Sequence, residues 1–260
     1  MNRLTRAAMA GALAAAVSFA AAQAAEVTVM GSGAFFAPFA KLAPGFEQAH
    51  GDHIVSIGGP SMGATPQAIP NRLARGEAAD VVIMAKPALE DLIAQGKVVK
   101  GSERDLVRSK IALAVKTGAP HPDISTVAAL KKTLLDAKSV AYSDSASGVY
   151  IATEMFAKMG IVEQMKAKSK MIPADPVGGF VAKGQYEIGF QQLSELKPVP
   201  GIDIVGYIPD AVQKVTVFSA GVVVGAKQPQ EAQALIDYLS SKDVDGIVVA
   251  SGLEPINAGK

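Results

Sequence analysis

Short apolar runs alternate with amphipathic segments along the first third of the chain after residue 25. The runs are rich in β-branched residues and end at glycine, proline or charge, which is typical of strands, whereas apolar residues at helical spacing predict helices between them. The predicted strands are Glu26–Gly31, Ile54–Ile57 and Asp80–Met84, and the predicted helices are Ala37–Ala49, the later turns of Thr65–Arg75, and Pro87–Gln95. This alternation indicates a parallel sheet covered by helices.

The pattern then restarts without an internal repeat, low-complexity tract or flexible linker. The further predicted elements are strand Lys110–Lys116, helix Thr126–Leu135, strand Ser139–Tyr142, helices Val149–Met159 and Gly178–Lys183, strand Glu187–Gln191, strand Thr216–Gly225 and helix Gln230–Ser240. Two such units predict an α/β protein with two lobes, each a mixed, mostly parallel sheet flanked by helices.

The spacing of the elements makes the strands around Lys110–Lys116 and Val217–Gly225 the best candidates to cross between the lobes. We expect residues 26–109 and 217–260 to form lobe I and residues 110–216 to form lobe II. Two crossings of this kind act as a hinge, and ligands bind in the cleft between the lobes.

The N-terminus has the layout of a secretory signal peptide. Arg3 and Arg6 precede the uncharged apolar run Ala7–Ala22, and Ala22-Gln23-Ala24 fits the small-x-small cleavage pattern. We expect residues 1–25 to be cleaved on export to a bacterial periplasm, which lowers the formal net charge from +1 to −1. Most of the hydropathy that would suggest a membrane protein lies in this segment.

Composition excludes several classes of function. The 25 basic side chains nearly cancel the 24 acidic ones, so no positive field is available to attract nucleic acid. The chain has no Cys and only three His, and its acidic residues show no metal-ligand spacing with them. We therefore expect no cofactor, no metal and no nucleic-acid partner, and we expect a monomer.

Small hydrogen-bonding residues gather where predicted strands end. Four loops have this character, namely Gly31–Gly33, Gly59–Thr65, Ser143–Gly148 and Asp175–Gly179. In α/β folds such loops lie at the ligand-binding edge of the sheet, and free backbone N–H groups at helix N-termini attract anions. Each loop alone could simply cap a helix, but together they predict an anion-binding cleft.

Motifs of hydrolytic enzymes are incomplete. Gly59-Pro60-Ser61-Met62-Gly63 matches the G-x-S-x-G nucleophile elbow, but only His121 follows it. Ser194-Glu195-Leu196-Lys197 matches S-x-x-K but follows Lys116-Thr117-Gly118, the reverse of the order in penicillin-recognising enzymes. We expect a binding protein and not an enzyme, and a periplasmic serine hydrolase using Ser61 is kept as an alternative.

Several segments together carry a family resemblance. They are Val29-Met30-Gly31-Ser32, Gly59-Pro60-Ser61, Arg75-Gly76-Glu77-Ala78-Ala79-Asp80-Val81, Ser147-Gly148-Val149-Tyr150 and Gly184-Gln185-Tyr186-Glu187-Ile188-Gly189. On these segments the chain resembles the periplasmic molybdate-binding proteins of bacterial ABC importers. The resemblance implies a type II two-lobe periplasmic binding fold, capture of a small oxyanion such as molybdate or tungstate, and a membrane permease as partner.

The resemblance also implies a ligand-binding set. Ser32 and Ser61 correspond to the family's serine donors, Ser147 and Val177 to its backbone donors, and Gln191 stands where a tyrosine is common. The full predicted set is Ser32, Gly33, Ser61, Met62, Ser147, Gly148, Tyr150, Val177 and Gln191. The second loop is also longer, so a small organic di- or tricarboxylate, taken up or sensed, is the alternative ligand.

Overall fold

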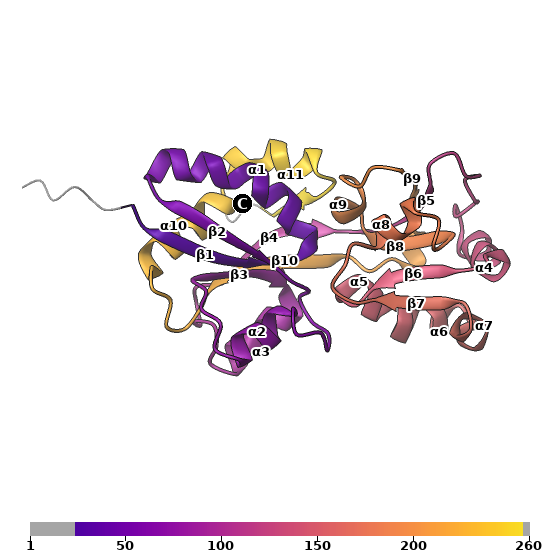
Figure 1. Ribbon diagram of the computed structural model, residues 1–260, viewed down its shortest axis with the longest axis horizontal. Helices are drawn as coiled ribbons and strands as arrows, with labels where there is room; N and C mark the ends of the chain where they lie inside the picture. The colour runs from indigo at the N-terminus through magenta and orange to yellow at the C-terminus, as the bar shows by residue number, and fades with distance from the viewer. Residues whose placement is uncertain (1–23, 257–260) are drawn as a thin grey trace, which may run out of the picture.

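The computed structural model describes residues 24–256, and the predicted signal peptide lies almost wholly outside them. Two sheets lie side by side along the longest axis of the molecule, each with its own helices (Figure 1). We call the sheet that contains β1 and its helices the first lobe, and the sheet that contains β6 and its helices the second lobe.

The first lobe is built on a mixed sheet. Within the described residues its strand order is β11-β4-β10-β3-β1-β2. The strands are β1 Glu26–Gly31, β2 His53–Gly58, β3 Val81–Ala85, β4 Arg104–Ser109, β10 Thr216–Val222 and β11 Glu254–Pro255. The helices are α1 Gly33–His50, α2 Ile69–Ala74, α3 Lys86–Ala94, α10 Pro229–Leu239 and α11 Asp245–Ala250. Strand β1 is parallel to β2 and β3, whereas β10 is antiparallel to β3 and β4.

The second lobe repeats the plan with the order β7-β6-β8-β5-β9. Its strands are β5 Ile111–Lys116, β6 Val140–Ser143, β7 Ser169–Ile172, β8 Ile188–Gln192 and β9 Ile202–Tyr207. Its helices are α4 Val127–Asp136, α5 Ala146–Tyr150, α6 Phe156–Lys158, α7 Val162–Lys166, α8 Val177–Ala182 and α9 Leu193–Leu196, with a π-helical turn at Ile151–Met155. Strand β6 is parallel to β7 and β8, and β5 is antiparallel to β8 and β9.

The chain passes between the lobes at two adjacent places. Only Lys110 separates β4 from β5, and residues 208–215 connect β9 to β10. Gln213 ties these two connections together: its Oε1 accepts from the Ile111 N–H at 2.9 Å, and its Nε2 donates to the Ile111 carbonyl at 2.9 Å. The lobe boundaries at 109/110 and 216/217 are consistent with these connections, and we retain them as a proposal.

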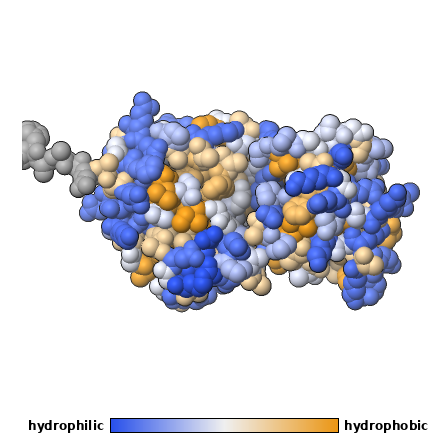
Figure 2. All heavy atoms as spheres, in the orientation of Figure 1, coloured by the Kyte–Doolittle hydropathy of each residue, from blue (hydrophilic) through white to orange (hydrophobic). Residues whose placement is uncertain are grey.

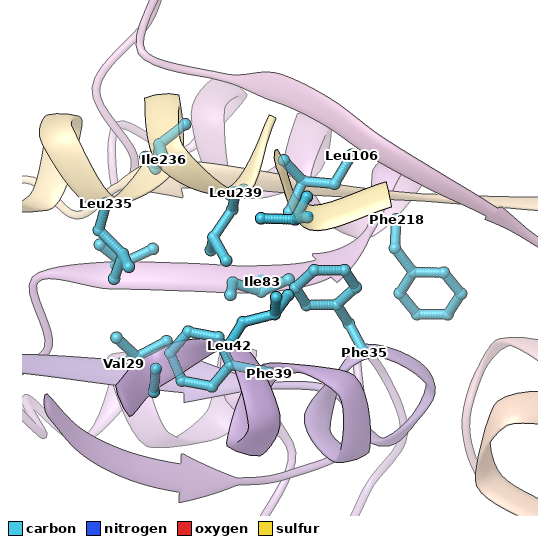
Figure 3. Packing of buried hydrophobic residues seen from close by; sticks show 14 of the residues in the cluster. Val29, Phe35, Phe39, Leu42, Ile83, Leu106, Phe218, Leu235, Ile236 and Leu239 are labelled. Carbon is cyan, nitrogen blue, oxygen red and sulfur yellow. The ribbon is translucent and has the colours of Figure 1, made fainter. Parts of the chain in front are cut away.

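Helix α1 supplies much of the core of the first lobe. Phe35, Phe39, Leu42 and Phe46 recur at helical spacing and are buried in the core cluster of the first lobe. Figure 3 shows Phe35, Phe39 and Leu42 among the buried side chains of the sheet and of helix α10. The helix begins at Gly33, earlier than the predicted Ala37, because the N–H groups of Phe35 and Phe36 both donate to the Ser32 carbonyl. Burial of each phenylalanine contributes about 1.5–3 kcal/mol, which outweighs the interruptions at two internal prolines.

Most predicted elements are present to within a few residues, but several short ones were not predicted. These are β4, β7, β9, β11, α7, α9 and α11. The sequence of β4, RDLVRS, has three charged residues of six, so its strand character comes from pairing with β10 and β11 and not from hydrophobic alternation. Helix α9 has four residues, too few for a periodic pattern.

The face of the molecule shown in Figure 2 is mostly hydrophilic, with apolar residues in small separate groups. Within residues 24–256, no helix has the length and hydropathy that a membrane span requires.

Candidate functional site

A cavity of about 740 Å³ lies between the two lobes, a size typical of small-molecule sites. The loops after β1 and β2 form one wall, and residues of β6, β8, α8, α9 and their loops form the other. The residues that line it are Gly31, Gly33, Phe36, Ala37, Gly58, Gly59, Pro60, Gln67, Ser143, Asp144, Ser145, Ala174, Asp175, Pro176, Gly179, Phe180, Lys183, Gln191, Glu195, Pro198, Val199 and Pro200.

Glu195 is the carboxyl group at the junction of the lobes. It lies in α9, which contacts α1 of the opposite lobe at the boundary seen in Figure 1. A Cβ atom built on Gly33, the first residue of α1, would lie only 2.0 Å from Glu195 Oε1. Because Gly33 has no side chain, the carboxyl group can lie against the N-terminus of the long helix α1.

Gln191 fixes the position of Glu195. Its Nε2 donates to Glu195 Oε1 at 2.9 Å, while its own Oε1 accepts from the Val177 N–H at 3.0 Å. Gln191 and Val177 are buried, so the amide cannot exchange these partners for bulk water. A chain of hydrogen bonds thus runs from the start of α8 through Gln191 to the carboxyl group in the cavity.

Burial raises the pKa of Glu195 from its ordinary value of 4.5 to about 7. Hydrogen bonds from the Gln191 side chain and the Gln192 backbone act in the opposite direction, and the negative charge of Asp144 adds to the rise in the pKa. A carboxyl group with a pKa near 7 can take up and release a proton at neutral pH.

Asp144 is a second carboxyl group in the same wall. It is 5% exposed, its Oδ1 accepts from the Ala174 N–H at 3.2 Å, and its Oδ2 is buried without a hydrogen-bond partner among the described residues. Burial raises its pKa as well. Asp144 therefore lies in the wall with one oxygen buried and the other already hydrogen-bonded, and its negative charge raises the pKa of Glu195.

Lys183 is the one cationic side chain among the described residues that line the cavity. Outside the cavity, the Arg72 and Arg75 guanidinium groups pair with the Glu77 carboxylate at 2.7 and 2.6 Å. No group of three or more His, Cys, Asp or Glu side chains within residues 24–256 is arranged to hold a metal ion.

Comparison with known proteins places the chain in a family. A family model described as bacterial extracellular solute-binding protein matches residues 27–254. The chain belongs to this family. The predicted resemblance is confirmed: the molybdate-binding protein of Azotobacter vinelandii is 29% identical over 251 residues, covering 93% of this chain and 94% of that protein.

The fold of this solute-binding protein also matches a solved structure. The periplasmic molybdate-binding protein of Azotobacter vinelandii superimposes with a TM-score of 0.71 at 20% identity, covering 90% of this chain and 100% of that one. The predicted type II two-lobe fold, with sheets flanked by helices, is therefore confirmed. At this identity, the structural match establishes the fold alone.

A third relative corrects the expectation that the protein is not an enzyme. This solute-binding protein is 53% identical over 232 residues to the aconitate isomerase of a Pseudomonas species, covering 89% of this chain and 88% of that protein. The sequence reasoning considered only hydrolytic nucleophiles with histidine or lysine partners. It did not consider a single buried carboxyl group that transfers a proton.

Of the predicted ligand-binding residues, Gly33 and Gln191 line the cavity of the solute-binding protein. Ser32, whose side chain forms no cap bond, lies buried at the start of α1, and its N–H donates to the Ile83 carbonyl at 2.8 Å. Val177 lies behind Gln191, to which its N–H donates. For all of them, contact with a ligand stays a prediction.

Ser61 lies where the lobes meet but does not line the cavity. It is 0% exposed, its Oγ accepts from the Ala85 N–H at 2.8 Å, and its N–H donates to Ser145 Oγ of the opposite lobe at 3.2 Å. Met62 beside it is partly buried in the core. The three histidines contact other residues: His50 stacks on Phe46, His53 pairs with Glu47, and His121 pairs with Asp203. In the described chain Ser61 therefore has no imidazole partner for hydrolysis.

The remaining predicted residues shape the loop after β6. Ser147 Oγ lies 3.1 Å from Ser143 Oγ, and a Cβ on Gly148 would lie 1.6 Å from the Ser143 carbonyl oxygen, so this turn excludes any larger residue. Tyr150 is buried and its hydroxyl donates to the Val212 carbonyl at 2.8 Å. These residues hold Ser143, Asp144 and Ser145 at the cavity wall.

Sequence reasoning missed Glu195 and Asp144. Each lies within four residues of the end of a predicted strand, Ser139–Tyr142 or Glu187–Gln191, at the edge where α/β folds bind ligands, and this position was the available signal. The sequence analysis took Glu195 as part of the S-x-x-K match and Asp144 as part of the Ser143–Gly148 loop, and it weighed both among the acidic residues that could bind a metal.

Proposed function

We propose that this solute-binding protein binds aconitate in the cavity between its lobes and interconverts the cis and trans isomers. The observation that carries the proposal is the 53% identity, over 89% of the chain, to the aconitate isomerase of a Pseudomonas species. Aconitate is a tricarboxylate, the alternative class of ligand expected from the sequence, and the protein would convert it as well as bind it.

The lining of the cavity supports a small polycarboxylate as ligand. Lys183 supplies a positive charge, the Ser143 and Ser145 hydroxyls can donate hydrogen bonds, and the N-terminus of α1 at Gly33 favours negative charge. Both lobes contribute to the wall, so closure around the ligand would exclude water.

The test is direct. The protein lacking residues 1–25 is incubated separately with cis-aconitate and trans-aconitate, and both isomers are followed by proton NMR. We expect both samples to reach the same mixture of isomers, at a rate proportional to protein concentration. A heat-denatured sample serves as the control, and no interconversion above that control would refute the isomerase function.

A second candidate function is the capture of an oxyanion for uptake through an ABC permease. The 29% identity to a molybdate-binding protein over 93% of the chain favours it. Titration calorimetry separates the candidates: tight molybdate and tungstate binding without isomerisation supports oxyanion capture, whereas binding of aconitate without isomerisation supports a carboxylate carrier.

We also propose that the protein works in the periplasm after removal of residues 1–25. The charge and hydropathy of that segment and the extracellular solute-binding family support this location. N-terminal sequencing of protein released from the periplasm tests it, and an intact Met1 would contradict the proposal.

A further inference from the structure

The geometry points to Glu195 as the base that carries the proton between two carbon atoms of aconitate during isomerisation. This inference rests on the proposed function and adds to it a named residue and a chemical path. It is carried by the position of the carboxyl group in the cavity, by its hydrogen bond to Gln191 and by the space that Gly33 leaves for it.

The chemistry of the substrate defines what is needed. Aconitate has a central carbon with a carboxylate, a CH₂–COO⁻ arm and a double-bonded =CH–COO⁻ arm, and rotation about the double bond is blocked. If a base removes one methylene proton, the electron pair of that C–H bond spreads over both arms. Both bonds from the central carbon to the two arms then have partial double-bond character, and the conformation in which the former CH₂ arm is held determines the geometry of the product.

Return of the same proton to the former =CH carbon completes the reaction. A C–H bond forms there, a double bond forms to the former methylene carbon, and that bond has the other geometry. The base ends as it began, nothing is oxidised or reduced, and no co-reactant is consumed. One carboxylate that can reach both carbons is therefore sufficient.

Glu195 meets these requirements. It lines the cavity and remains partly exposed to it, while Gln191 and Gly33 confine its Oε1 from both lobes. Burial raises the pKa of Glu195 to about 7, and the negative charge of Asp144 adds to the rise, so the carboxyl group can accept a proton near neutral pH. The other charged groups in the cavity wall are Asp175 and Lys183.

The other described groups at the cavity are less suited. Asp144 Oδ2 is buried and Oδ1 already accepts from the Ala174 N–H, so Asp144 is less available as a base. Its negative charge raises the pKa of Glu195. Asp175 is exposed, and water competes for its carboxylate. Lys183 carries the opposite charge and suits a substrate carboxylate.

The test compares Glu195→Gln with Glu90→Gln, the same change at an exposed glutamate of α3 that does not line the cavity. A positioned base contributes about 10²–10⁴-fold to rate, so we expect E195Q to lose at least about 100-fold in kcat and E90Q to stay within about threefold. Calorimetry with trans-aconitate should give E195Q a Kd within about tenfold of the parent, and thermal unfolding checks that both variants fold.

A readout specific to the base is the pH profile. Activity of the parent should rise with pH through a single ionisation near 7, and Glu195→Asp should retain weak activity with that ionisation, whereas the residual activity of E195Q should lack it. An active parent with an equally active E195Q would overturn the inference and leave the isomerase function standing. An inactive parent would overturn both.

Discussion

Gly33 and Glu195 pack against each other across the two lobes, although they lie far apart in the sequence. A Cβ built on Gly33 would lie 2.0 Å from Glu195 Oε1. Non-bonded atoms do not approach so closely, so a side chain at position 33 must displace the Glu195 carboxyl group. The contact explains why a helix that could accommodate alanine elsewhere begins with glycine here.

We therefore predict that Gly33→Ala lowers kcat by at least about tenfold, since small displacements of a reacting group are costly. The matched control is Gly179→Ala, because Gly179 also lines the cavity and a Cβ there would meet no atom within 4 Å. Initial rates with cis-aconitate measure both variants. Equal rates for the two would show that the Gly33–Glu195 contact has no part in activity.

The raised pKa of Glu195 predicts opposite effects of pH on activity and on stability. Below about pH 7 the folded protein holds a proton that the unfolded chain releases above 4.5, so the free energy of unfolding should fall as the pH rises from 4.5 to 7. Activity should rise over the upper part of this range. Urea unfolding of the parent and E195Q at several pH values isolates the contribution of Glu195, which the glutamine variant should lack.

Gln191→Met should raise the pKa of Glu195 above that of the parent, because the Gln191 hydrogen bond lowers it. The same change leaves the buried Val177 N–H without its acceptor and should cost about 1–3 kcal/mol in the free energy of unfolding. Gln67→Met, at an exposed residue of the cavity wall, is the control. An activity profile for Q191M that does not move to higher pH would contradict the proposed hydrogen-bond chain.

Gln213→Ala should destabilise the fold by about 1–3 kcal/mol, because the N–H of the buried Ile111 loses its acceptor, whereas the Ile111 carbonyl still accepts from the Ile208 N–H. Gln233→Ala removes only an exposed amide–carboxylate bond on α10 and should change the free energy of unfolding by less than about 0.5 kcal/mol. Urea unfolding compares the two, and equal stabilities would show that the Gln213 bridge is dispensable.

The fold could be predicted from the sequence because the main strands and helices each have a recognisable pattern of apolar residues. Strands β1, β3 and β5 are short apolar runs, and α10 has apolar residues at helical spacing, so each is recognisable alone. By contrast, β9 lies at the edge of its sheet with most side chains only partly buried, and pairing with β5 defines it.

The site was less predictable because its chemistry arises from tertiary contacts. Gln191 was recognised at the end of a strand, but its partners Val177 and Glu195 are determined by the packing of α8 and α9. Nothing in the local sequence of Glu195 indicates a shifted pKa, since burial and the nearby Asp144 cause the shift.

The contact between α1 and α9 has a consequence for how this protein could be divided. Burial is the largest cause of the raised pKa of Glu195, and Gly33 of the first lobe lies against its Oε1, while Asp144 and Gln191 belong to the second lobe. A fragment containing the second lobe alone would keep the residue and expose its carboxyl group to water on the side that Gly33 now covers. Reactivity would then be a property of the assembled pair, and a hinge motion that parts the lobes would return Glu195 to the behaviour of a common surface acid.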